Sequence, residues 1–544
     1  MRLKSLSVLL FTALTLAACS RPAPTAVNPA SASAAAVASS AHAADGIAWR
    51  HAASDADVDA AFATARTQNK PVFVYWGAAW CPPCNQLKAT LFNRQDFIAR
   101  SKAFVAVYID GDSPGAQKLG TRFKVRGYPT TVLFNAEGVE LTRLPGEVDA
   151  AQYTQLLTLG MNAQRPVKAV LAAAQEPSTA TQLSANDWKL LAFYSWETDE
   201  QQVVNQAQLP ALLKQLAQAC PASESDTATR LLLKSLASAV SSSEKSAPPQ
   251  SQHRERVMKL LADPVASRSQ MDVLTHSAAE VVRGLSAPKS TERTALVGSF
   301  NTALKALEAD TTLSRADRLT ALSARVELAK IDGVEDAKPA IPEALQAEVR
   351  AHVAAADRGI TDGYERQAVI TSAADVLEQA GLLAESTALL ERNLGKSHSP
   401  YYLMSGLASN AKKRGDAVEA LRWSESAFTK SEGPATRLQW GASYVKTLVE
   451  LAPQDEARIE KTVQQLFTEA AAQPDAFFER SARSLQRVGT QLQSWNKDKK
   501  HAAVVQRLQT QMTEICKGLP AQDTQRAACE AVFKPPASAG DKAT

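Results

Sequence analysis

The strongest constraint on the fold of this chain is a short junction, WCPPC at residues 80–84. The run VFVYWG at 72–77 precedes it and predicts a buried strand, because it is rich in β-branched and aromatic residues. The segment NQLKATLF at 85–92 follows and has the apolar spacing of a helix. Proline is tolerated in a first helical turn, where the backbone N–H has no intrahelical partner. The cysteine pair is therefore predicted at a strand-to-helix junction, with Cys81 at the helix N-terminus.

The sequence around this junction alternates between helical and strand patterns. Helices are expected at 53–68, 95–102, 113–125 and 149–161, a second strand at 104–110, and a β-hairpin from 130–134 and 139–144 around the turn NAEG. This order predicts an α/β unit in which helices cover a central sheet.

Residues 48–161 resemble the thioredoxin superfamily. The likeness rests on WCPPC after a buried strand and on Gly127-Tyr128-Pro129-Thr130 before the hairpin. It is closest to the branch that contains the C-terminal domain of the envelope electron carrier DsbD, through the turn Asp110-Gly111-Asp112 and the NAEG turn. The resemblance implies a thioredoxin fold in which Cys81 and Cys84 are catalytic. It also implies that Trp80, Tyr128 and Pro129 bind substrate, with Pro129 as the family's cis-proline.

The expected chemistry follows from the position of the two sulfur atoms. Free N–H groups and the helix dipole favour negative charge at a helix N-terminus, so the pKa of Cys81 should lie below that of a free cysteine. Cys81 would attack a partner disulfide, and Cys84, one turn deeper, would resolve the mixed disulfide. We therefore expect a thiol–disulfide oxidoreductase without a cofactor, acting on protein thiols or disulfides in either direction.

Two departures from the family pattern and one rival interpretation bear on this expectation. The buried acid of reducing members is replaced by Tyr75, and its lysine partner by Ala106, which argues against rapid reductase turnover. A zinc site is the rival interpretation of the pair, but zinc takes four ligands and the seven histidines are scattered. We expect no metal.

The first residues predict export and a lipid anchor. Arg2 and Lys4 precede an apolar run too short to span a membrane, so residues 1–18 are interpreted as a signal peptide. Leu16-Ala17-Ala18-Cys19 resembles the bacterial lipobox, which implies lipidation of Cys19; cleavage at Ala41-His42-Ala43 lies too far from the apolar run. Residues 19–47 are rich in Ala, Ser and Pro and predict a flexible tether. The expected location is the bacterial envelope, facing the periplasm. By resemblance to enterobacterial lipoprotein sorting, Ser20 after the cysteine favours the outer membrane.

From residue 162 to 540 helical patterns replace the strand patterns, which predicts an all-α domain, with a linker-like cluster at 241–252. Within 373–434 two segments match with a shift of 34 residues, so that Gly381 falls on Gly415 and Pro400 on Pro434. This is the tetratricopeptide period, and we expect degenerate repeats of that kind in which proline ends the second helix. Such arrays bind peptides or proteins, or act only as spacers.

Three further cysteines and the charge balance complete the expectations. Cys516 and Cys529 flank a break between helices and would form a structural disulfide in an oxidising compartment, which leaves Cys220 as a buried apolar residue. The net charge of +4 comes without a long basic block, so we expect no nucleic-acid partner.

The sequence thus predicts a thioredoxin fold followed by an all-α, tetratricopeptide-like domain. The expected protein is a lipid-anchored oxidoreductase whose partners are protein thiols or disulfides, an upstream envelope electron donor, and a peptide or protein held by the helices. The alternative is a binding scaffold, in which the helices carry the function and the thioredoxin unit is not a working enzyme.

Overall fold

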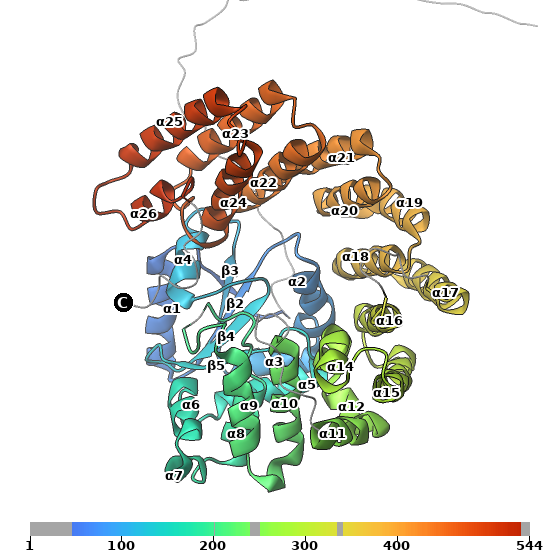
Figure 1. The fold of residues 1–544 in the computed structure, drawn as a ribbon. Helices are drawn as coiled ribbons and strands as arrows, with labels where there is room; N and C mark the ends of the chain where they lie inside the picture. Colours follow the sequence, from blue (N-terminus) through green and yellow to red (C-terminus); the bar gives the residue numbers. More distant parts are fainter. Residues whose placement is uncertain (1–45, 201, 240–250, 334–340, 535–544) are drawn as a thin grey trace, which may run out of the picture. The chain divides into compact units, whose positions relative to one another are not determined.

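A five-stranded sheet, with the spatial order β1-β3-β2-β4-β5, organises the first part of the computed structural model (Figure 1). The structure describes residues 46–200, 202–239, 251–333 and 341–534. The strands are β1 (Arg50–His51), β2 (Val72–Gly77), β3 (Val105–Asp110), β4 (Thr130–Phe134) and β5 (Glu140–Leu144). β2 runs parallel to β3 and antiparallel to β4, while β4 and β5 form an antiparallel hairpin. The predicted α/β order is thereby confirmed.

Several sequence predictions fall on residues that the structure does not describe. The signal peptide 1–18, the lipidation site Cys19 and all but the last two residues of the tether 19–47 lie outside the described residues. So does most of the linker-like cluster at 241–252. These remain predictions.

Helices lie on both faces of the sheet. They are α1 (Asp55–Gln68), α2 (Pro82–Leu87), which continues as a π-helical turn η1 (Lys88–Phe92), α3 (Gln95–Ser101), α4 (Ala116–Phe123) and α5 (Ala150–Met161). Their bounds agree with the sequence patterns to within a few residues. The sequence analysis missed β1, because a two-residue strand is too short to show an alternating pattern.

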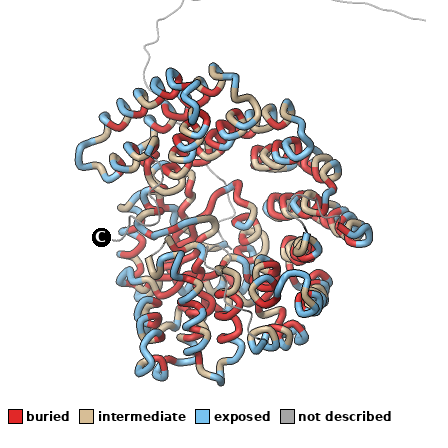
Figure 2. The backbone as a smooth tube through the Cα atoms, in the orientation of Figure 1, coloured by how far each residue is buried: buried red, intermediate tan, exposed pale blue. Residues whose placement is uncertain are grey.

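The sheet is buried on both faces, which explains why β2 reads as a continuous apolar run. Phe73 and Tyr75 belong to the core that contains the cysteine pair, whereas Val74 and Trp76 pack in the opposite core beneath α1 and α4. Side chains alternate between the faces of a strand, so both sets are filled by one segment. Figure 2 shows the buried residues along the strands and on the inward sides of the surrounding helices.

The rest of the described chain is helical, apart from turns and a single bridge between Val125 and Asp199. In chain order the α-helices are α6 (Val167–Gln175), α7 (Pro177–Ala180), α8 (Ala185–Ala192), α9 (Leu209–Ala219), α10 (Ser225–Ala239), α11 (Ser251–Ala262), α12 (Pro264–Ser269), α13 (Met271–His276), α14 (Ala278–Leu285), α15 (Thr291–Ala309), α16 (Arg315–Ala329), α17 (Glu343–Gly359), α18 (Gly363–Gln379), α19 (Leu383–Asn393), α20 (Pro400–Lys413), α21 (Ala417–Lys430), α22 (Pro434–Leu451), α23 (Glu456–Ala471), α24 (Glu479–Trp495), α25 (Ala502–Gly518) and α26 (Gln525–Glu530). The 3-10 turns are η2 (Ala222–Glu224) and η3 (Leu394–Lys396). Among the described residues, no helix combines the length and apolarity needed to cross a bilayer.

The residues that match at a spacing of 34 occupy equivalent places in successive helix pairs. Gly381 lies between α18 and α19, and Gly415 lies between α20 and α21; both have a left-handed backbone, with φ of 81° and 79°. Pro400 and Pro434 do not end a helix, as the sequence analysis expected, but stand at the first position of α20 and α22. Proline fits there because its missing N–H would be unpaired in any case.

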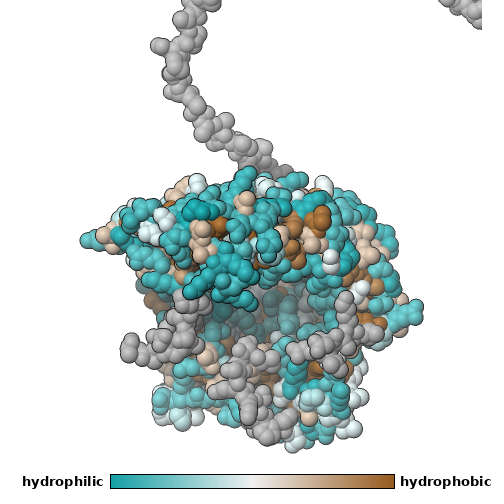
Figure 3. Space-filling view, turned by 45° about the horizontal axis from the view of Figure 1, so that its top comes forward, coloured by the Kyte–Doolittle hydropathy of each residue, from teal (hydrophilic) through white to brown (hydrophobic). Residues whose placement is uncertain are grey.

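The helical region packs directly against the sheet domain, within the single compact unit that spans Asp45–Thr544. In Figure 1, α2 lies between the sheet and α18, and α4 lies next to α24. The face shown in Figure 3 is mainly hydrophilic and hollowed near its centre. Among the described residues the exposed large hydrophobic side chains are scattered rather than gathered in a patch: Val139, Val265, Tyr364 and Val418.

A buried arginine joins β5 to the chain that enters the helical region. Arg143 has no exposed surface and donates to the carbonyl oxygens of Phe123 (2.5 Å), Lys124 (2.7 Å) and Thr198 (3.0 Å). It also pairs with Glu140 at 2.9 Å. Two of these carbonyls lie just before the loop that carries Pro129, so Arg143 fixes the approach to the candidate site.

Replacing this arginine should destabilise the whole unit. We expect Arg143→Met to lower the free energy of unfolding by about 3–5 kcal/mol, because Glu140 loses its buried cationic partner and three buried carbonyl oxygens each lose a hydrogen bond. Urea denaturation followed by circular dichroism measures the change. The matched control is Arg422→Met, which removes an exposed pair with Glu419 and should change stability by about 0.5 kcal/mol or less. Equal effects of the two substitutions would contradict the assigned role of Arg143.

Candidate active site

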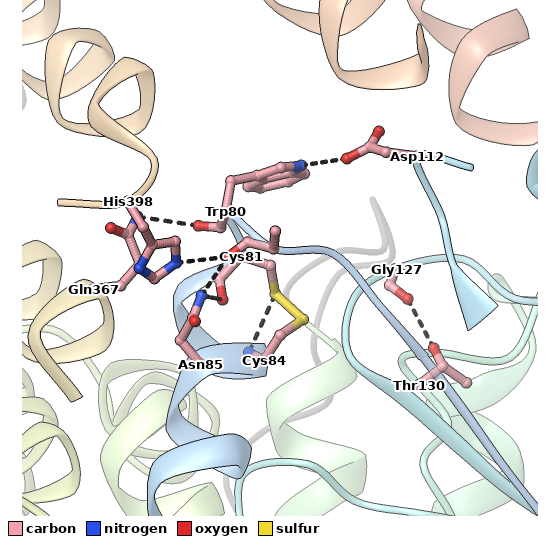
Figure 4. Close-up of a disulfide and its surroundings, with 10 residues drawn as sticks. Trp80, Cys81, Cys84, Asn85, Asp112, Gly127, Thr130, Gln367 and His398 are labelled. Carbon is pink, nitrogen blue, oxygen red and sulfur yellow. Dashed lines mark hydrogen bonds between the residues drawn. A yellow bond between two sulfur atoms is a disulfide. The ribbon is translucent and has the colours of Figure 1, made fainter. Parts of the chain in front are cut away.

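Cys81 and Cys84 form a disulfide at the N-terminus of α2, with Cα atoms 5.2 Å apart (Figure 4). Cys81 is the N-cap residue, and the backbone N–H of Cys84 donates to its Sγ atom at 3.2 Å. Pro82 occupies the first helical position, where no donor is needed. The geometry places the Cys81 sulfur at the end of the helix where N–H groups are free and negative charge is favoured.

A buried asparagine holds the turn that presents this pair. Asn85 has no exposed surface, and its amide donates to the carbonyl oxygens of Ala79 (2.7 Å) and Cys81 (2.8 Å). It thereby fixes the backbone on both sides of Trp80. Sequence reasoning did not identify Asn85, which appeared only as the first residue of a helical pattern.

The loop before β4 lies on the other side of the disulfide from Asn85 (Figure 4). The Tyr128–Pro129 peptide bond is cis. Thr130 Oγ1 donates to Gly127 O at 2.8 Å, which closes the turn, and Gln117 Nε2 donates to the Tyr128 hydroxyl at 3.2 Å. The residues expected to bind substrate are thus found around the cysteine pair.

Asp112 connects Trp80 to the helical region. Its carboxylate accepts a hydrogen bond from Trp80 Nε1 at 3.0 Å (Figure 4). It also accepts from the backbone N–H of Thr436 (2.9 Å), from the Thr436 hydroxyl (2.6 Å) and from Arg480 Nη2 (2.6 Å). Asp112 and Arg480 are both mostly buried, so this is a shielded, charge-assisted pair.

Aromatic side chains of the helical region cover the Trp80 ring. Tyr402 stacks on it with centroids 5.8 Å apart and an interplanar angle of 19°, and Trp440 meets it edge-on at 6.3 Å. The Arg480 guanidinium lies 5.2 Å from the Trp80 ring and 4.9 Å from the Tyr128 ring. Trp80 is consequently only 8% exposed.

The backbone beside the cysteines is also bound by the helices. Gln367 Nε2, from α18, donates to Trp80 O at 3.2 Å, and His398 Nε2 lies 3.1 Å from Ala79 O (Figure 4). After these contacts Cys81 is 2% exposed and Cys84 is fully buried. Sequence reasoning missed this contribution, because nothing in the spacing of residues 280 or more positions apart marks them as neighbours.

The family's buried acid and lysine are absent from the folded site as well. Tyr75 and Ala106 are both buried in the core that holds the cysteines. Burial raises the pKa of Tyr75 well above its ordinary value, so its hydroxyl remains protonated at neutral pH and cannot accept a proton as a general base. Burial likewise raises the pKa of the carboxyl group of Asp110, at the end of β3.

Three further cysteines lie in the described helical region. Cys516 and Cys529 form a disulfide between α25 and α26, with Cα atoms 5.7 Å apart. Cys220 is a free, buried thiol, and burial raises its pKa to about 11. In the described part of the chain, no group of three or more His, Cys, Asp or Glu side chains is arranged to hold a metal ion.

Comparisons with known proteins bear on residues 58–160, which match the family model of the thioredoxin-like domain. The chain is 36% identical over 88 residues to a thioredoxin-like protein of Synechocystis sp., covering 79% of that protein, and 33% identical over 89 residues to the thioredoxin of Acidithiobacillus ferridurans, covering 78% of it. It is also 31% identical over 113 residues to the thiol:disulfide interchange protein DsbD 1 of Pseudomonas aeruginosa. That alignment spans 20% of this chain and 19% of the relative.

The two buried thiols should differ in reactivity once the disulfides are reduced. We expect iodoacetamide at pH 7 to alkylate Cys81 faster than Cys220, because the reactive form is the thiolate and the helix N-terminus favours it at Cys81. Cys220 stays protonated at this pH, since its pKa is about 11. Mass spectrometry of digested, time-quenched samples measures both rates, and the urea-unfolded chain, in which the rates should converge, serves as the control. Equal rates in the folded protein would show that α2 does not activate Cys81.

Proposed function

This chain belongs to the family of thioredoxin-like proteins, and we propose that it is a thiol–disulfide oxidoreductase whose working couple is Cys81–Cys84. The observation that carries the proposal is the disulfide at the N-terminus of α2 with the cis Tyr128–Pro129 bond in the adjoining loop. The relatives named as thioredoxins or as thiol:disulfide interchange proteins support the same chemistry. Proteins bearing thiols or disulfides are the proposed partners.

In the reducing direction, the reaction starts from the dithiol. The Cys81 thiolate attacks one sulfur of a partner disulfide, which forms a mixed disulfide and releases the other partner sulfur as a thiolate that takes up a proton. Cys84 then loses its proton and attacks Cys81 Sγ, so that the Cys81–Cys84 disulfide forms and the second partner thiol leaves. Two electrons pass to the partner. The opposite direction begins with the oxidised couple and a partner dithiol.

Proton removal from Cys84 has no carboxylate of the family's usual kind to assist it. Tyr75 occupies that position and is already protonated, so water or the leaving partner thiolate takes the proton in this proposal. This arrangement favours slow, selective exchange over rapid general reduction. An upstream dithiol donor in the envelope would re-reduce the couple.

The proposed location is the bacterial envelope, with the chain anchored through lipidated Cys19. Support comes from the signal-like sequence of residues 1–18 and from the DsbD relatives. A disulfide between Cys516 and Cys529 fits an oxidising compartment. In this setting the tetratricopeptide-like helices would contribute to partner selection.

A binding scaffold without redox activity is the second candidate, because the cysteine pair is almost completely buried. The two functions differ in what Cys84→Ala does. For an oxidoreductase this variant should accumulate mixed disulfides through Cys81, since the residue that resolves them is gone.

The measurement is the fraction of protein recovered as dithiothreitol-sensitive adducts after expression in a bacterial envelope and acid quenching, with partners identified by mass spectrometry. The controls are Cys81→Ala, which should trap nothing, and Cys220→Ala, which should behave like the parent chain. If Cys84→Ala traps no more than Cys81→Ala, the scaffold is the better description.

A further inference from the structure

We propose that the helical region makes the Cys81–Cys84 couple selective for cysteines in small molecules and extended peptide segments, and excludes cysteines on folded protein surfaces. The inference rests on the proposed function and names the substrate class of that same couple. Tyr402 and Gln367, which contact Trp80 from the helical region, are the specificity-determining residues.

One side of the couple is enclosed by contacts from three helices and from the loop before α20. Gln367 on α18, His398 before α20, Tyr402 on α20 and Trp440 on α22 all contact Trp80 or the carbonyl before it. These contacts involve the ring of Trp80, its carbonyl oxygen and the carbonyl oxygen of Ala79. A partner approaching from this side would have to displace all of them together.

The indole N–H of Trp80 is held on the same side by Asp112. That carboxylate is bound in turn by Thr436 and Arg480, from α22 and α24. Because Arg480 and Asp112 are largely shielded from water, separating them would leave two charges poorly solvated. The helical residues that contact Trp80 are therefore held in place by this ion pair as well as by packing.

The opposite side of the couple is less covered. Pro82, Gly127 and Pro129 are partly exposed, and Pro83 is exposed. A Cβ atom built on Gly127 would meet no described atom within 4 Å. An extended peptide segment of a partner can therefore lie against this exposed side, between the start of α2 and the cis-proline loop.

Disulfide geometry sets how close a partner must come. The Cα atoms of two joined cysteines are usually about 4.4–6.8 Å apart, so the backbone of a partner must come that near to Cys81. Cys81 itself is 2% exposed and Trp80 is 8% exposed, so its sulfur lies below the surrounding surface. A free thiol or a single extended strand can reach such a depth, whereas the broad surface around a cysteine in a folded domain meets the helices first.

Substituting Tyr402 is a direct way to weaken the contacts between the helical region and Trp80. With Trp440 it lines a cavity of about 180 Å³ on α18, α19, α20 and α22. Removing the Tyr402 ring extends this existing cavity toward Trp80. The stacking contact is lost, while the cysteines, Asn85 and the cis-proline loop keep their own contacts.

The experiment compares three thiols as reductants of the oxidised full-length protein. They are glutathione, an unstructured peptide of about 12 residues with one cysteine, and a folded domain with one surface cysteine. The reductant's thiolate attacks Cys81 and forms a mixed disulfide with it, which releases Cys84 as a free thiol. Second-order rate constants come from acid-quenched alkylation of the released Cys84 and from the mass of the Cys81 adduct, both read by mass spectrometry, and are normalised to the thiolate fraction of each reductant. We expect the folded-domain thiol to react at least about tenfold more slowly than the peptide thiol.

The variants test whether the helices cause this difference. Tyr402→Ala should raise the folded-domain rate at least about fivefold while the glutathione rate changes less than about twofold. Gln367→Ala, which removes the hydrogen bond to Trp80 O, is a second and milder variant with the same expected direction. Trp423→Ala truncates an aromatic side chain on α21 that packs on Arg422 and against the helical core that includes Leu403. It is the matched control for lost aromatic packing and should change neither rate, because the contacts on Trp80 stay in place. Circular dichroism verifies that each variant is folded.

The outcomes separate this inference from the proposed function. If all three thiols reduce the parent chain at equal normalised rates, the proposed substrate selectivity is wrong and the oxidoreductase proposal stands. The same holds if both folded variants leave the ratio of folded-domain to glutathione rates unchanged. If none of the three thiols reduces Cys81–Cys84, the proposed function itself fails.

Discussion

The carboxylate of Asp112 is the interaction on which the arrangement of the site depends. It follows β3 in the sheet domain, and it receives donors from Trp80 in the same domain and from Thr436 and Arg480 in the helical region. Its oxygens are thus shared between the residue that precedes the redox couple and two helices that close over it. The sheet domain and the helices are therefore parts of one site, joined through a group that neither part would satisfy alone.

This dependence explains why the two cysteines are enclosed. The contacts on Trp80 use its ring, its N–H and its carbonyl oxygen, so the side chain and its peptide are fixed in one orientation. Cys81 is the next residue, so its backbone position is restricted by the fixed Trp80 peptide. The proposed selectivity and slow exchange rest on a couple that is almost completely buried, with Tyr75 in place of a proton acceptor.

Much of the sheet domain could be predicted from the sequence because its signals are local. The apolar run 72–77, the proline-containing junction and the hairpin residues each encode a short piece of backbone, and the order of the pieces determines the topology. The couple was identified for the same reason. The two-residue strand β1 and the buried role of Asn85 lack such a local signal.

The helical residues that enclose Trp80 could not be predicted, because no local sequence pattern shows which distant residues they contact. Gln367, Tyr402 and Arg480 lie in helices whose patterns report only which face is apolar, and a polar residue on such a face can meet any neighbour. The spacing of 34 residues did identify equivalent positions in two helix pairs. It carried no information about where those pairs would dock, and it misplaced Pro400 and Pro434, which begin helices instead of ending them.

The separation between Asp112 and Arg480 has a consequence for how the protein is made. Arg480 is added 368 residues after Asp112, so the nascent chain contains a complete sheet domain long before it contains the residue that completes the enclosure. Ribosomal synthesis proceeds from the N-terminus, and domains generally fold as units in that order. Until the helices that carry Gln367, Tyr402 and Arg480 have been added, the couple lacks the contacts that restrict what can react with it.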